Sequence, residues 1–189
     1  MEKTSKNMVL RILIAVCFIW LPVNGVRYFI SSKTYESGNI LAMVVALLPV
    51  IAGLFIVIGA LLGSRVVIGL GSVIYVLQAG YSIYVYIMNM QQDLPDEGKK
   101  GFRSLIITTA LMLLAFLFLA LACFIKRSDL AICILAVVLF VVWFFVRRGQ
   151  LPDGAAKWPL QLVLTAAGSV LGTILSALLF AVRKKKVEA

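Results

Sequence analysis

Residues 104–125 read SLIITTALMLLAFLFLALACFI, a run without any Asp, Glu, Lys or Arg. An α-helix rises about 1.5 Å per residue, so about 20 apolar residues cross the hydrocarbon core of a bilayer. A backbone N–H or C=O without a partner in lipid costs several kcal/mol, and a helix pairs all of these groups internally. The run lacks the alternation of apolar and polar residues that marks a transmembrane strand. It therefore predicts a transmembrane helix.

Similar charge-free runs occur along the whole chain of 189 residues. Hydrophobic residues make up 62% and charged residues 14% of it, against about half and about a quarter in soluble domains. This composition excludes a water-soluble fold and predicts an all-α membrane protein, a bundle of six transmembrane helices in one polytopic domain over residues 1–189. We expect the helices at approximately 8–30, 39–62, 66–89, 104–125, 129–147 and 158–182.

The first predicted helix has a second interpretation. Lys3, Lys6 and Arg11 form a basic segment ahead of the apolar residues 12–21, as in a secretory signal peptide, so residues 1–25 could be cleaved. The alternative is a membrane helix whose flanking arginines extend their long side chains to the two interfaces. Both interpretations stay open on the sequence.

The basic residues predict the orientation. With the N-terminus inside, ten Lys and Arg residues lie on the cytoplasmic side and eight outside, and the inside connections are much the shorter. The positive-inside rule then places both termini in the cytoplasm, and we expect the protein in the plasma membrane. We expect the run from Arg183 to Lys186 to contact anionic lipid headgroups. A net charge of +10 is explained by this role, so we expect no nucleic-acid partner.

Neutral polar residues gather toward the predicted outer half. Tyr75, Gln78 and Ser82 share one face of the third helix. If the first, third and sixth helices are neighbours, they could line a shallow outward-facing pocket in which Arg27 meets an anionic group. The alternative is ordinary hydrogen bonding between helices, worth about 0.6 kcal/mol for each bond. The candidate pocket residues are Asn24, Arg27, Tyr75, Gln78, Ser82 and Gln161.

Small residues recur at helical spacing in two of the predicted helices. The sixth carries Gly168, Gly172 and Ser176 at intervals of four, and the second carries Gly59 and Gly63. Such residues let helix backbones approach closely in lipid, where apolar bulk gives no reason to associate. They predict a helix-packing seam, either within one bundle or against a partner protein or a second copy.

The residues that are missing limit the chemistry. The chain contains no histidine, and no predicted helix has Asp or Glu at membrane depth. The three cysteines lack CxxC spacing. We therefore expect no catalytic residues, no metal and no cofactor, and two functions are favoured over a third, an integral membrane enzyme. The first is a non-enzymatic membrane subunit or accessory protein that packs against partners, and the second is a small-molecule carrier or substrate-binding subunit of a transporter.

The overall plan resembles the substrate-capturing subunits of energy-coupling-factor vitamin importers in its length, its six helices and its predicted orientation. The resemblance is architectural and implies a binding site that faces outward. The first helix lacks the small-xxx-small docking motif of such subunits, and Ala42 with Ala46 lies on the second helix instead. Membership of that family is not indicated.

Overall fold

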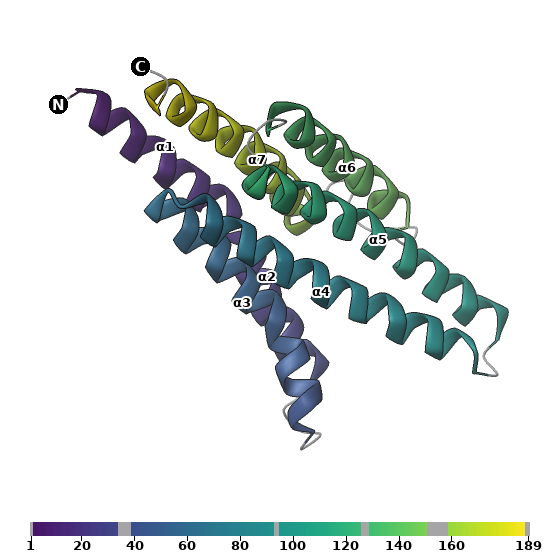
Figure 1. The fold of residues 1–189 in the computed structure, drawn as a ribbon. Helices are drawn as coiled ribbons and strands as arrows, with labels where there is room; N and C mark the ends of the chain where they lie inside the picture. The colour runs from purple at the N-terminus through teal and green to yellow at the C-terminus, as the bar shows by residue number, and fades with distance from the viewer. Residues whose placement is uncertain (1, 34–38, 93–94, 126–128, 151–158, 188–189) are drawn as a thin grey trace.

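The computed structural model describes residues 2–33, 39–92, 95–125, 129–150 and 159–187, and all regular structure in these ranges is α-helical. Figure 1 shows the helices packed into one elongated bundle. Their bounds are α1 (Glu2–Phe18), α2 (Trp20–Ser32), α3 (Ile40–Leu62), α4 (Arg65–Met90), α5 (Asp96–Phe124), α6 (Asp129–Gly149) and α7 (Leu160–Val187).

Within the described residues, six helical segments are long and apolar enough to cross a membrane. These segments are Asn7–Ser31, Ala42–Leu62, Arg65–Met90, Asp96–Phe124, Ala131–Gly149 and Leu160–Phe180. The first joins α1 and α2 end to end. The predicted all-α fold with six membrane helices is confirmed, and by helix hydropathy the chain is a multi-pass membrane protein.

The bounds differ most from the prediction at α5, which begins at Asp96 and not near residue 104. Pro95 directly precedes this helix, and Asp96 and Glu97 occupy its first turn. Carboxylates stabilise the positive end of a helix, and proline is well tolerated at its start. The charge at Arg103 marks where the apolar run begins. It does not mark where the helix begins.

Helices adjacent in sequence pack against each other from α2 to α7, and α1 packs against α7 and α3. Figure 1 shows the start of α1 and the end of α7 at the same end of the bundle, called the terminal end below. The opposite end, where α2, α4 and α6 finish, is called the loop end. The basic run from Arg183 to Lys186 belongs to α7, but its side chains lie outside the described part of the structure.

The first membrane segment is interrupted where α1 meets α2. Ile19 forms a turn between the two helices, and Pro22 follows in the first turn of α2. Proline has no N–H, so the carbonyl of Phe18 loses its helical partner. The neighbouring bond from Val23 N–H to the Ile19 carbonyl is long, at 3.4 Å. Helix α1 thus runs along α7, whereas α2 follows α3.

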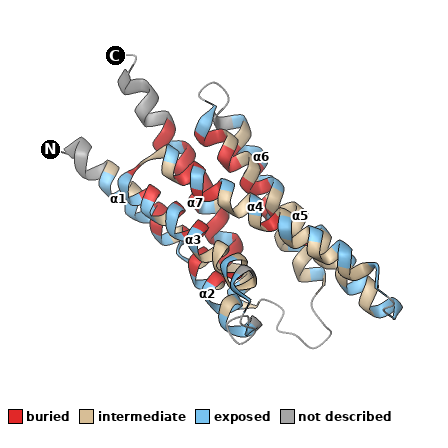
Figure 2. Ribbon diagram, turned by 60° about the horizontal axis from the view of Figure 1, so that its bottom comes forward, coloured by how far each residue is buried: buried red, intermediate tan, exposed pale blue. Residues whose placement is uncertain are grey.

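Two close approaches hold α2 against α3. A Cβ atom built on Gly25 would lie 2.7 Å from the Val50 backbone nitrogen, and one built on Gly53 would lie 2.5 Å from Pro22. Side chains larger than hydrogen do not fit at these two positions. Figures 1 and 2 both show the α2–α3 pair diverging from α4 and α5 toward the loop end.

The tight core lies nearer the terminal end. Phe18, Phe116, Phe140 and Phe180 are fully buried there, and the Phe116 and Phe140 rings meet edge to face with centroids 5.3 Å apart. Arg65 closes this end: its guanidinium donates to the Ala122 carbonyl at 3.0 Å and lies 4.3 Å above the Phe180 ring. Figure 2 shows buried residues along the inner faces and exposed ones outside, as a lipid-facing surface requires.

Candidate functional site

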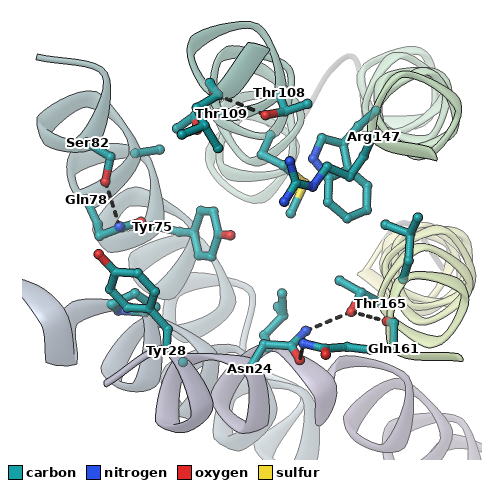
Figure 3. Close-up of a pocket in the computed structure, with 18 of the residues that line it drawn as sticks. Asn24, Tyr28, Tyr75, Gln78, Ser82, Thr108, Thr109, Arg147, Gln161 and Thr165 are labelled. Carbon is teal, nitrogen blue, oxygen red and sulfur yellow. Dashed lines mark hydrogen bonds between the residues drawn. The ribbon is translucent and has the colours of Figure 1, made fainter. Parts of the chain in front are cut away.

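A cavity of about 500 Å³ lies in the half of the bundle toward the loop end. Helices α2, α4, α5, α6 and α7 contribute most of its wall, and Pro49 of α3 completes it. It occupies the space left where α2 bends away from α7 and the α2–α3 pair diverges from α4. Its polar lining residues are Asn24, Tyr28, Tyr75, Gln78, Ser82, Tyr86, Thr108, Thr109, Arg147, Gln161 and Thr165. Figure 3 labels these residues around the cavity, except Tyr86.

One wall joins α2 to α7 by hydrogen bonds. Asn24 donates from Nδ2 to Thr165 Oγ1 at 2.7 Å and accepts at Oδ1 from Gln161 Nε2 at 2.8 Å. The Thr165 hydroxyl donates in turn to the Gln161 carbonyl at 2.7 Å. Since α2 and α7 pack only marginally, this network is what ties them together along the cavity (Figure 3).

The opposite wall is the polar face of α4. Tyr75, Gln78 and Ser82 follow one another at intervals of three and four, so they lie on one side of the helix. Gln78 Nε2 donates to Ser82 Oγ at 3.0 Å, a bond within α4 itself. The Tyr75 ring stacks on Phe116 of α5 with centroids 4.1 Å apart, and Figure 3 shows its hydroxyl directed into the cavity.

Helices α5 and α6 form the third side. The Thr108 hydroxyl bonds to the carbonyls of Ser104 and Leu105 in its own helix, both at 3.1 Å. Trp143 and Arg147, four residues apart on α6, both line the cavity. Arg147 Nη1 donates to Gln150 Oε1 at 3.4 Å, and Gln150 reaches the Ser104 carbonyl at 3.4 Å. Figure 3 shows the guanidinium group of Arg147 pointing toward the centre.

Five of the six residues predicted for a pocket line this one cavity: Asn24, Tyr75, Gln78, Ser82 and Gln161. Arg27 does not. It is exposed on α2 and borders a separate shallow depression between α2 and α3. The cavity-facing position one helical turn after Asn24 belongs to Tyr28, the residue that directly follows Arg27. The placement of Arg27 differs from the prediction because α2 turns its Arg27 side outward when it packs on α3.

Arg147 is a charged lining residue outside the set predicted from the sequence. The pair Arg147 and Arg148 directly follows the apolar run of the predicted fifth membrane helix, where arginines ordinarily extend toward the headgroups. The available signal was the spacing of Trp143 and Arg147, which places an aromatic ring and a cation on the same helix face. Thr108, Thr109 and Thr165, neutral polar residues of the same predicted outer half, also line the cavity.

The small-residue seam of α7 packs against α1 of the same chain. A Cβ atom on Gly168 would overlap the carbonyl oxygen of Cys17, and one on Gly172 would lie 2.7 Å from the Phe18 ring. Ser176 is fully buried and donates to the Gly172 carbonyl at 2.7 Å. The seam therefore serves contact between helices of one chain.

The glycines of α3 serve its junction with α4. A Cβ atom on Gly59 would lie 2.6 Å from the backbone nitrogen of Ile68. Gly63 ends α3 with a φ of 64°, in the left-handed region that glycine adopts readily. The Ser64 N–H then bonds to the Gly59 carbonyl at 2.8 Å. Gly59 thus permits close packing, whereas Gly63 forms the turn.

No family model matches the chain, and neither the curated proteins nor the solved structures contain a match. The architectural resemblance to vitamin-capturing subunits thus gains no support from these comparisons. The function has to be argued from the geometry of the bundle and its cavity.

Proposed function

We propose that this chain is a non-enzymatic membrane protein that holds a small organic molecule in the loop-end cavity, as a carrier or the substrate-binding subunit of a transporter does. The volume of about 500 Å³ lies within the range of roughly 300–1,000 Å³ typical of small-molecule sites. Such sites occur between the helices of bundles and combine apolar walls with a few polar groups. This cavity has both.

The observation that carries the proposal is the polar face of α4. Polar side chains at membrane depth ordinarily serve as hydrogen-bonding links between helices. Asn24, Gln161 and Thr165 fit that description, since they join α2 to α7. Gln78 and Ser82, by contrast, bond to each other on α4, and within the described residues their side chains form no hydrogen bond to another helix. A polar face that bonds to no neighbouring helix, beside an open volume, favours a ligand or water as its partner.

The alternative role, docking to a partner through the small-residue seam, loses its main support because α1 fills that seam. Catalysis is not favoured either: the chain has no histidine, and the polar groups that the described residues bring to the cavity are hydroxyls, amides, the Trp143 indole and one guanidinium. With both termini in the cytoplasm, as the basic residues favour, the cavity would face the outside of the plasma membrane.

Native mass spectrometry of the protein released from mild detergent tests the proposal. We expect a small molecule bound in one copy per chain. Ala79 lines the cavity and is 1% exposed, so Ala79→Phe should fill the volume and release the ligand. Val138 on the outer face of α6 is 51% exposed, and Val138→Phe is the matched control that should retain it.

Gln78→Leu is a second variant that removes the polar group while nearly preserving volume, in case the larger substitution prevents folding. Loss of the ligand from Gln78→Leu, with normal gel filtration, supports the proposal. A parent protein that carries a tightly bound polypeptide and no small molecule would favour the docking role instead. Equal ligand retention by all the variants would contradict the cavity as the site.

A further inference from the structure

Among the residues that the structure describes, Arg147 is the one charged side chain that lines the cavity, and no Asp or Glu lines it. The residue lies in the last turn of α6 beside Arg148. Two arginines there would both suit the negative end of the helix dipole and the headgroup interface. Figure 3 shows that Arg147 points inward over the cavity. Anchoring at the interface does not explain that direction.

The guanidinium has hydrogen-bonding capacity to spare. Arginine carries five N–H donors and cannot lose its charge in a protein. Arg147 uses one donor in a long bond of 3.4 Å to Gln150. A cation that points into a partly apolar cavity is costly unless an anion or a polar group faces it. The planar fork of arginine suits a two-oxygen acid, to which it donates two parallel hydrogen bonds.

Aromatic and aliphatic side chains line the cavity between the amide and hydroxyl groups described above. Tyr28, Tyr75 and Tyr86 line the cavity together with Trp143 and Met112. Figure 3 shows the Tyr75 hydroxyl and the Arg147 guanidinium both directed toward the middle. A charged group on α6, with aromatic rings on α2, α4 and α6, suits an amphipathic occupant.

We propose that the cavity binds an amphipathic organic anion, whose acidic group pairs with Arg147 and whose apolar body packs against the aromatic side chains of α2, α4 and α6. This inference rests on the proposed function of the cavity. The anion can come from the aqueous side, as a small aromatic carboxylate, or from the bilayer, as a fatty acid. The two sources share the chemistry that Arg147 recognises.

The fluorescence of Trp143 measures occupancy, because Trp143 lines the cavity. Trp20→Phe and Trp158→Phe leave it as the sole tryptophan of the three. Two matched pairs of quenchers are added to the purified protein: 4-nitrobenzoate with neutral 4-nitrobenzamide, and 5-doxylstearate with its methyl ester. The first pair tests the aqueous source, and the second tests the bilayer source.

We expect saturable quenching by at least one anion, at a Kd at least tenfold lower than that of its neutral partner. Arg147→Gln should weaken binding of that anion roughly tenfold to a hundredfold, the range that corresponds to a hydrogen bond to a charged group. Binding of the neutral probe should change less than about twofold, which shows an intact cavity. Arg147→Lys should recover part of the affinity. Arg27→Gln, exposed and outside the cavity, should bind both probes as the parent does.

The outcomes separate the two proposals. If each anion and its neutral partner bind equally, and Arg147→Gln changes neither, the inference about the anion is wrong and the binding cavity stands. If no probe quenches saturably and Ala79→Phe changes nothing, both proposals are wrong. Loss of 5-doxylstearate binding alone in Arg147→Gln supports an anion drawn from the bilayer. Loss of 4-nitrobenzoate binding alone supports an aqueous one.

Discussion

Replacing Gly168 by alanine should destabilise the contact between α1 and α7. The added Cβ atom would overlap the carbonyl oxygen of Cys17, which belongs to the backbone of α1 and cannot rotate away as a side chain could. The two helices must therefore move apart. One turn further along, Gly172 faces the fully buried ring of Phe18, so the separation also loosens that contact.

The magnitude follows from overpacking a tight helix contact. Inserting a methyl group into a filled core costs about 1–3 kcal/mol. For a protein of 150–250 residues, 1 kcal/mol changes Tm by about 2–4 °C. We therefore expect Gly168→Ala to lower the Tm by roughly 2–12 °C. The particle mass should not change, since the contact lies within one chain.

Gly80→Ala is the matched control. Gly80 lies inside α4 at membrane depth, and its added Cβ atom would meet only Leu113 Cδ1, at an ordinary contact distance of 3.9 Å. Alanine favours the helix over glycine by about 1 kcal/mol, so this variant should match or exceed the stability of the parent.

The assay heats each variant in mild detergent and measures the fraction that still elutes as a single gel-filtration peak. The packing of α1 on α7 would be refuted if Gly168→Ala and Gly80→Ala had the same Tm. A lower particle mass for Gly168→Ala at unchanged Tm would indicate that the seam joins two copies of the chain.

Three further predictions concern the cavity and the terminal end. In a background with Cys17, Cys123 and Cys133 replaced by alanine, a membrane-impermeant maleimide added outside should label Ser82→Cys and spare Val138→Cys; labelling only from the cytoplasmic side would contradict the predicted orientation. Arg65→Met removes the bond to the Ala122 carbonyl and the contact with the Phe180 ring. It should therefore destabilise the protein by about 1–3 kcal/mol. A Tm equal to that of the exposed variant Arg27→Gln would show that Arg65 contributes nothing to stability. Asn24→Leu breaks both hydrogen bonds between α2 and α7 and should lower stability by about 1 kcal/mol. The expected result is a decrease in Tm of a few degrees. An increase in Tm would mean that the hydrogen-bond network is strained.

The α4 face shows how far the sequence reaches into the site. Tyr75, Gln78 and Ser82 fall on one side of any helix because the residues advance about 100° each, so their grouping needed no neighbour. Their position in the same cavity as Asn24 and Gln161, in contrast, depends on how the neighbouring helices pack. Arg27 and Arg147 look equivalent in the sequence, since each follows the charge-free run of a membrane segment. An interfacial arginine can extend outward to headgroups or inward to a cavity, and only the rotation of its helix against the others selects one direction.

The six membrane helices were determined by the sequence itself, because the bilayer acts as a uniform solvent and the transfer of each segment depends on its own residues. The sequence also predicted the small-residue seam of α7. It did not predict which helix packs against the seam, since a stripe of glycine and serine accepts any helix that approaches closely. The tertiary structure decided that α1 fills it. The structure also showed that the interruption at Ile19 and Pro22 turns α2 onto α3. That turn opens the cavity, and it depends on which helices surround α2, information that no single segment carries.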